Sequence, residues 1–355
     1  MKKVILLLFV CAMNLLVFSQ DKEAAEALIT EGIALHDNGD FTGAIAKYDK
    51  ALELDKDNLL ALAEKAFSLM SAERYDETIV CCKRAIAAHP GDPQLNNIYT
   101  SYGTALDGLQ QSEKAIVIYD EGIKFFPGSY QLYYNRSVTL YSLSRVEEAL
   151  DGFQQAIVLN PDHGSSHNAI ARIMKGNDKR IQSLLAYWRF LVVEPEGKRA
   201  HENFVAMQEL MGQGVEKTGK KSVSISVTQD MLGDTTAQGK PNENSFAMVD
   251  LLLTVTSALD YDKKNKKKSP QELFISKLET VCASMEEAQK ENRGFFWTYY
   301  APYFIEMKQQ NLLEPFAYIA FATSGDSHGM KWIKENAGAI EKFYDWSNDY
   351  SWKMK

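Results

Sequence analysis

The sequence of 355 residues has only four cysteines and six histidines, and no long apolar run after its first twenty residues. So few cysteines argue against a disulfide framework, and no further membrane-spanning helix is expected without an apolar stretch of about twenty residues. Acidic residues outnumber basic ones by 47 to 39, and this net charge of -8 disfavours nucleic acid as a partner. We interpret Cys81, Cys82 and Cys282 as small buried thiols.

Sequence motifs of catalysis are also missing. The chain has no GxSxG, no HExxH, no phosphate-binding glycine loop and no CxxC, so we predict a protein that is not an enzyme and needs no cofactor or metal. His163 and His167 in "HGSSH" lie four residues apart, but a turn is expected there and no third ligand is near, so both are interpreted as surface histidines. The lysine run at 263–268 is interpreted as a solvated loop, with binding to an anionic surface such as lipid or acidic polysaccharide as the alternative.

The first twenty residues, "MKKVILLLFVCAMNLLVFSQ", are typical of a secretory signal peptide. They combine a basic start, an apolar centre and small residues before a cleavage site, which we place after Ser19. An uncleaved membrane anchor is the alternative. A lipid anchor is disfavoured because Val10 stands where a small residue should precede Cys11. We therefore predict an exported protein, periplasmic or secreted, with no membrane span after cleavage.

A spaced pattern recurs along the chain. In "EEALDGFQQAIVLNPD" (147–162), Ala149, Phe153 and Ala156 share a helix face and Pro161 marks its end. The same pattern begins at residues 44, 78, 115, 149 and 183, at intervals of 34, 37, 34 and 34. A second series of small residues lies twelve positions upstream, and comprises Gly32, Ala66, Gly103, Ser137 and Ala171. A fixed period of this length indicates stacked repeats of two helices, in which small residues allow close helix contact.

Residues 31–58 and 133–162 resemble tetratricopeptide repeats throughout. We assign five units, 25–58, 59–92, 96–129, 130–163 and 164–197. The resemblance implies an all-α fold, an α-α superhelical solenoid. In the fifth unit Phe190 replaces a small residue, so its helix pair is expected to splay. A capping helix is expected over 198–212 because a repeat array needs its last apolar face covered.

The remainder of the chain resembles no family that we identify. Residues 213–243 are predicted to be a linker with one short strand in "SVSISV" (222–227), for which no partner strand is evident. Residues 244–355 are predicted to be an aromatic-rich helical domain, with helices near 245–260, 270–290, 295–309, 312–323 and 328–346. Core packing is the expected role of most of its aromatic residues. An exposed aromatic patch is the alternative, which would let this domain bind a small ligand or glycan, or carry an unrecognised activity.

The resemblance also implies a binding surface, because the first helices of tetratricopeptide units line a concave groove that binds peptides. By register that groove would contain Ile29, Ile33, Phe67, Met70, Thr104, Tyr134, Val138, Tyr141, Asn168, Arg172 and Lys175. Ile29 and Ile33 stand where some family members place a lysine and an asparagine that grip a terminal carboxylate, so that mode is disfavoured. An apolar peptide or protein segment is the expected partner. The C-terminal helices of the chain itself are the alternative occupant.

These observations favour a non-enzymatic scaffold of the cell envelope or secreted space that binds a peptide or protein partner.

Overall fold

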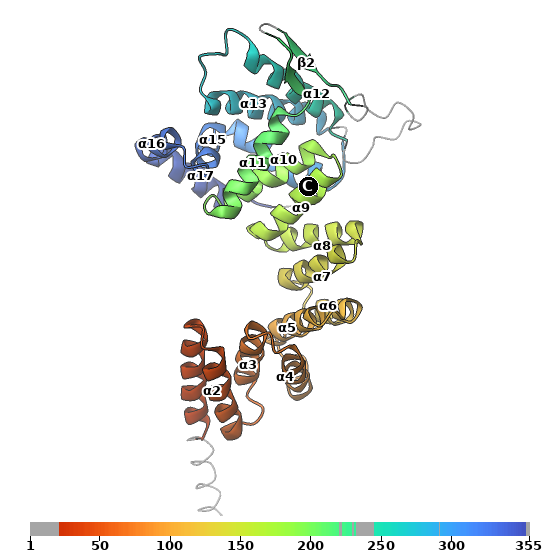
Figure 1. Ribbon diagram of the computed structural model, residues 1–355, viewed down its shortest axis with the longest axis vertical. Coiled ribbons are helices and arrows are strands. Elements are labelled where there is room, and N and C mark those ends of the chain that lie inside the picture. The colour runs from red at the N-terminus through yellow and green to blue at the C-terminus, as the bar shows by residue number, and fades with distance from the viewer. Residues whose placement is uncertain (1–20, 220–221, 229–230, 232–244, 291, 353–355) are drawn as a thin grey trace, which may run out of the picture. The chain divides into compact units, whose positions relative to one another are not determined.

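The computed structural model describes residues 21–219, 222–228, 231, 245–290 and 292–352 (Figure 1). The signal peptide predicted over 1–19 lies outside these residues. The described part is helical apart from one two-stranded sheet, so the all-α prediction is confirmed. It divides into two compact units, of which the first ends at Leu159 and the second begins at Asn160. We call these unit 1 and unit 2.

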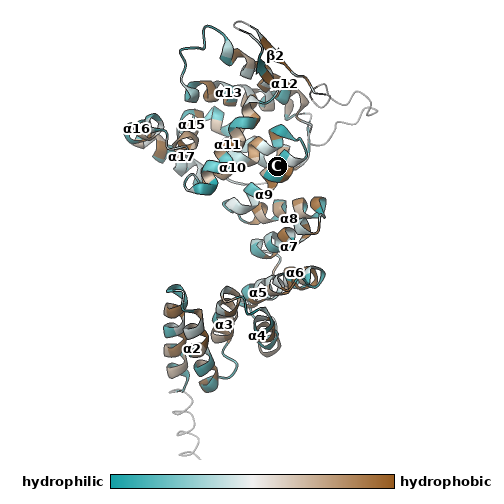
Figure 2. Cartoon of the chain, viewed as in Figure 1, coloured by the Kyte–Doolittle hydropathy of each residue, from teal (hydrophilic) through white to brown (hydrophobic). Residues whose placement is uncertain are grey.

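Unit 1 consists of helical hairpins. Residues 21–37 are helical. The helices that follow are α2 (Phe41–Leu54), α3 (Leu59–Ser71), α4 (Tyr75–Ala88), α5 (Leu95–Gly108), α6 (Ser112–Phe125), α7 (Tyr130–Ser142) and α8 (Val146–Leu159). Figure 2 shows apolar and polar residues side by side along them, as amphipathic helices require. Asp40 and Asn58 cap α2 and α3 by accepting hydrogen bonds from backbone amides of the first turn.

The small residues of the repeat are needed because a large side chain approaches each of them. A Cβ added to Gly32 would lie 2.5 Å from the ring of Tyr48, and one added to Gly103 would lie 2.3 Å from the ring of Tyr119. Both tyrosines are buried. The first and third repeats thus each fill their interior with one tyrosine ring that packs against a glycine, which is the close packing that the intervals predict.

The turn inside each repeat is equally regular. Its central residue has a positive φ between 55° and 81°, and these residues are Gly39, Glu73, Gln110, Ser144 and Asp178. They recur at the same intervals of 34, 37, 34 and 34 residues. At each turn the same three backbone hydrogen bonds close the first helix. Only the first turn uses glycine, so the other four residues adopt a conformation that tertiary packing must hold in place.

In unit 2, several helices pack around one buried helix, α10. Its helices are α9 (Gly164–Gly176), α10 (Arg180–Val193), α11 (Lys198–Gly212), α12 (Ala247–Ala258), the short η2 (Leu259–Tyr261), α13 (Pro270–Ala288), the π-helical turn η3 (Phe296–Tyr300), α14 (Ala301–Gln309), α15 (Leu313–Ala322), α16 (Ser327–Glu335) and α17 (Ala337–Asp349). Every residue of α10 from Arg180 to Val192 is buried, because α9, α11, α12, η3 and α15 all contact this helix.

The predicted splay of the fifth repeat is not observed. Phe190 is buried, and the Ser183 hydroxyl donates a 2.8 Å hydrogen bond to the carbonyl of Ala171 across the α9–α10 interface. The Phe190 ring is accommodated next to α11, where the guanidinium of Arg199 lies 5.3 Å from the ring centroid.

The strand predicted in 222–227 has a partner that the sequence pattern did not reveal. β2 (Val223–Ile225) pairs in antiparallel fashion with β1 (Val215–Lys217), with Val215 opposite Ile225. Gly214, with a φ of 81°, lets the chain turn into β1 beside Thr254 of α12. Three residues of β1 carry too little alternation to be recognised as a strand by themselves.

The helix starts of the C-terminal region are partly as expected. Ser269 and Glu272 form a reciprocal capping box with Pro270 at the first position of α13. α12 begins at Ala247, close to the predicted residue 245, and has no side-chain cap. The single helix expected over 328–346 is two helices, α16 and α17, which meet at Asn336.

One further turn repeats the geometry of the tetratricopeptide-like hairpins without their sequence pattern. Asn311, between α14 and α15, has a φ of 59°, and the three backbone hydrogen bonds around it match those at residues 39, 73, 110, 144 and 178. Phe304 and Phe316 stand at the positions where the repeats have small residues. Their ring centroids are 6.3 Å apart, so two large side chains occupy the space that a repeat keeps for one.

Candidate protein-binding surface

The first helices of the repeats in unit 1 stack directly on one another, because α5 contacts both α3 and α7. Equivalent positions therefore form rows across the helices. One row contains Ile33, Phe67, Thr104 and Val138, and the next contains His36, Met70, Asp107 and Tyr141. Positions three apart on a helix share a face, so both rows belong to one surface, which we call the first-helix surface.

Three side chains of this surface are strongly exposed. Phe67 is 53% exposed, Val138 41% and Tyr141 50%. Ile33, Met70, Thr104 and Tyr134 are half-buried. Ile29 was expected here, but it is only 1% exposed and belongs to the core of unit 1. The expectation for Ile29 is wrong because its row faces inward at the first repeat.

The end of the surface near the first repeats is held in place by ring stacking. The imidazole of His36 stacks on Phe67 with centroids 4.6 Å apart and planes 22° apart. His36 Nδ1 lies 2.7 Å from the buried hydroxyl of Ser68. The His36 ring, which the Ser68 hydroxyl holds in place, therefore fixes the orientation of the exposed Phe67 ring. His36 was not singled out from the sequence, although its place 34 residues before Met70 puts it in the same row.

The middle of the surface is polar. The Thr104 hydroxyl donates to the carbonyl of Thr100 at 2.9 Å. The Asp107 carboxylate accepts hydrogen bonds from Ser112 at 2.5 Å and from Thr139 at 3.1 Å. These bonds fix a carboxylate between the apolar side chains of the second and fourth repeats. Asp107 was also not predicted, and its interval of 37 residues from Met70 is the signal that would have identified it.

Comparison with known proteins identifies the repeats. Residues 35–102 match the tetratricopeptide repeat family model. The chain therefore contains tetratricopeptide repeats. It is 25% identical over 267 residues to an Hsp70-Hsp90 organizing protein of Triticum aestivum. The aligned region covers 74% of this chain and 44% of that relative. It is 29% identical over 114 residues to the photosystem I assembly protein Ycf3 of Prochlorococcus marinus, over 28% of this chain and 66% of Ycf3.

Solved tetratricopeptide structures are similar over about half of the chain. The structure of Pseudomonas aeruginosa PilF has a TM-score of 0.47 and 19% identity, covering 54% of this chain and 84% of its own. That of YrrB, described as having an unusual peptide-binding site, has a TM-score of 0.39 and 20% identity, covering 54% and 95%. The chain spans less than half the length of the organizing proteins that it matches.

The last three residues of the predicted groove belong to unit 2. Asn168, Arg172 and Lys175 lie on α9, where Arg172 is exposed and the other two are half-buried. Lys175 forms an ion pair with Glu209 at 2.9 Å. The structure therefore brings Ile33, Phe67, Met70, Tyr134, Val138 and Tyr141 together in unit 1 and places these three residues in the other unit.

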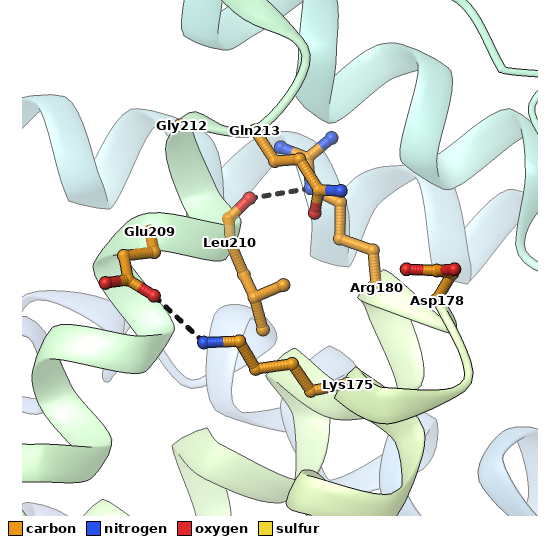
Figure 3. Close-up of a pocket in the computed structure, with 7 residues that line it drawn as sticks. All are labelled: Lys175, Asp178, Arg180, Glu209, Leu210, Gly212 and Gln213. Atoms are coloured by element: carbon orange, nitrogen blue, oxygen red, sulfur yellow. Dashed lines mark hydrogen bonds and ion pairs between the residues drawn. The ribbon is translucent and has the colours of Figure 1, made fainter.

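Lys175 also lines a pocket of about 310 Å³ (Figure 3), together with Asp178, Arg180, Glu209, Leu210, Gly212 and Gln213. Arg180 is buried, and its guanidinium donates to the carbonyls of Leu210 and Met211 at the end of α11 and to Asp250 and Thr254 of α12. Because Arg180 and Lys175 are both engaged by the chain, the pocket offers no free cation for an anionic ligand. The Arg180 guanidinium instead caps the C-terminal end of α11 by binding its last carbonyl groups.

The histidine pair is not a surface feature. His167 is fully buried, in contrast to the expectation from the sequence. Its Nε2 donates to the carbonyl of Pro161 at 2.9 Å, so its Nδ1 accepts from the hydroxyl of Tyr300 at 2.7 Å. Burial lowers the pKa of His167 to about 3, with a smaller contribution from Arg189. Within the described ranges no group of three acidic, histidine or cysteine side chains could hold a metal.

The cysteine thiols and most of the clustered aromatic rings, which could otherwise react or bind a ligand, are also buried. Cys81, Cys82 and Cys282 are free and buried, and burial raises the pKa of Cys81 to about 11 and that of Cys282 to about 12. Six of the seven aromatic residues in "GFFWTYYAPYF" are buried. Trp297 stacks on Phe246 with centroids 4.1 Å apart. These rings form the core of unit 2 and present no aromatic patch for a sugar.

In the parts of the chain that the structure covers, no helix combines the length and the hydrophobicity that crossing a membrane requires.

Proposed function

We propose that this chain is a non-enzymatic scaffold that binds an apolar segment of a partner protein through the first-helix surface. The observation that carries this proposal is the exposure of Phe67, Val138 and Tyr141 on stacked first helices. Exposed apolar side chains that gather on one surface mark interaction sites more often than isolated ones do. Relatives named as organizing and assembly proteins support a role in contacts between proteins.

The surface also indicates the chemistry of the segment that fits it. Phe67 and Met70 form one apolar cluster and Val138 and Tyr141 a second, and the carboxylate of Asp107 lies between them. A matching segment has apolar side chains at both ends and a hydrogen-bond donor in the middle, which would pair with Asp107. Ile33 replaces a polar residue that would grip a terminal carboxylate, so an internal segment is favoured over a chain end.

A photocrosslinking experiment tests the surface. With benzoylphenylalanine at position 67 or 141 of the full chain, we expect both variants to crosslink the same partner in an extract of cells that produce the protein. Phe67→Ser combined with Tyr141→Ser should reduce co-purification of that partner by at least about tenfold, since exposed aromatic anchors dominate such interfaces.

Val117 on α6 supplies the matched control, because it is exposed but lies on a second helix. Benzoylphenylalanine at 117 should not crosslink that partner, and Val117→Ser should leave its recovery unchanged. Equal crosslinking from 67, 141 and 117 would contradict a binding surface on the first helices.

The site of action that we propose is the cell envelope or the secreted space, on the basis of the signal-like segment at residues 1–19. The protein recovered from the envelope or medium of its native cells is expected to begin at Gln20. N-terminal sequencing measures this directly. A chain that keeps Met1 and remains in the cytoplasm would contradict export and would leave the binding proposal to stand on its own test.

A further inference from the structure

α12 has a second apolar face in addition to the one that it buries. Val249 and Leu253 are buried in the core of unit 2. On the opposite side, Met248, Leu252 and Val255 follow at spacings of four and three, and Leu259 of η2 continues them after four more residues. These four residues, which we call the α12 stripe, are between 37% and 60% exposed. Such spacing places them along one line of the helix.

The hairpin that α12 contacts carries further exposed apolar side chains. α12 contacts both β1 and β2, and Ile225 of β2 and Val227 just after it are exposed. Tyr261 follows the end of the stripe and is likewise exposed. Among the described phenylalanine, tyrosine and tryptophan residues of unit 2, Tyr261 alone is exposed, and the others are buried or half-buried.

The stripe ends in a cluster of positive charge. Five lysines, Lys263, Lys264, Lys266, Lys267 and Lys268, come directly after Tyr261 and are all exposed. Asp262 is the one acidic residue among them, and its side chain accepts a hydrogen bond from the backbone of Lys264. Asp260 is paired with Lys277. None of the five lysines forms an ion pair with any residue that the structure describes, and this local excess stands out in a chain of net charge -8.

From this combination we infer that α12 and the lysine loop form a peripheral binding surface for an anionic lipid bilayer. The α12 stripe inserts its side chains among the acyl chains while the helix lies in the membrane plane. Tyr261 lies at the level of the headgroups, where amphipathic rings accumulate. The lysines pair with lipid phosphates. A protein partner would satisfy the stripe alone, whereas the five unpaired lysines at its end favour a negatively charged lipid surface.

Vesicle co-sedimentation tests the inference with the exported form, residues 20–355, so that the apolar segment before residue 20 contributes nothing. We expect binding to vesicles of phosphatidylcholine with about one third phosphatidylglycerol and none to phosphatidylcholine alone. Raising the salt concentration should weaken binding, since the attraction to the lipid surface is partly electrostatic.

Two sets of variants separate the apolar and the charged contributions. Leu252→Ser with Val255→Ser, and Lys266→Gln with Lys267→Gln and Lys268→Gln, should each weaken vesicle binding by at least about tenfold. Val205→Ser on α11 and Lys331→Gln with Lys334→Gln on α16 replace exposed residues elsewhere in unit 2, and they should bind as the wild type does. Circular dichroism melting verifies that every variant is folded.

Binding that ignores lipid charge, or that survives both sets of variants, would overturn the inference. So would failure to bind any vesicle. If the chain instead self-associates in analytical ultracentrifugation, and Leu252→Ser with Val255→Ser abolishes that association, the stripe is a protein interface and the lipid assignment is wrong.

Discussion

Replacing Arg189 with alanine is expected to lower the free energy of unfolding of unit 2 by roughly 3–5 kcal/mol. The guanidinium is buried in the middle of α10. It donates hydrogen bonds to the hydroxyls of Tyr303 at 3.2 Å and Ser347 at 3.1 Å, and to the carboxylate of Asp162 at 2.5 Å. One buried cation thereby joins α10 to α14, to α17 and to the turn before α9.

The size of this effect follows from packing more than from the ion pair. The Asp162 side chain is mostly exposed, so its loss of a partner costs little. The Arg189 guanidinium lies 5.0 Å from the ring centroid of Tyr303 and 4.7 Å from that of Trp352, and desolvated contacts of this kind contribute about 2 kcal/mol or more. Alanine would also leave a cavity beside these rings.

Tryptophan fluorescence during chemical unfolding measures this change selectively, because all five tryptophans follow residue 159 and therefore report on unit 2. Arg172→Ala on α9 is the matched control, since Arg172 is exposed. Its effect should stay within about 0.5 kcal/mol. A loss below about 1 kcal/mol for Arg189→Ala would show that the apolar core of unit 2 holds its helices together without this cation.

Acidification is expected to destabilise unit 2 through His167. The pKa of His167 is lowered from the ordinary 6.5 to about 3 in the folded protein. Between these values the unfolded chain binds a proton that the folded chain does not. The stabilising contribution is therefore complete above pH 6.5 and is lost as the pH falls toward 3. Over this window it amounts to roughly 5 kcal/mol.

The variant His167→Gln isolates this effect, since glutamine can donate to Pro161 and accept from Tyr300 but does not titrate. We expect the free energy of unfolding to fall less steeply with decreasing pH in the variant than in the wild type. Protonation of His167 is opposed by burial and by the nearby Arg189 and His163. His201→Gln, an exposed position on α11, should keep the wild-type slope. Parallel curves for the wild type and His167→Gln would contradict the assignment.

The first-helix surface shows which exposed residues can be predicted from the spacing of the repeats. The intervals of 34 and 37 residues placed Phe67, Val138 and Tyr141 on exposed positions of stacked helices. They did not distinguish Ile29, which has the same register position as the half-buried Tyr134 but is buried in the core of unit 1. The register assigns a residue to a row, whereas the neighbouring helices decide which members of that row reach solvent.

The repeat helices and their turns follow from the sequence alone, because their signals are local. A glycine facing an aromatic ring, as with Gly103 and Tyr119, needs only a fixed spacing within one hairpin. Tertiary structure alone decided the burial of His167 and Arg189 and the pairing of β1 with β2. Each depends on contacts between residues distant in the chain, such as Arg189 with Ser347, and no spacing within one helix or strand records such contacts.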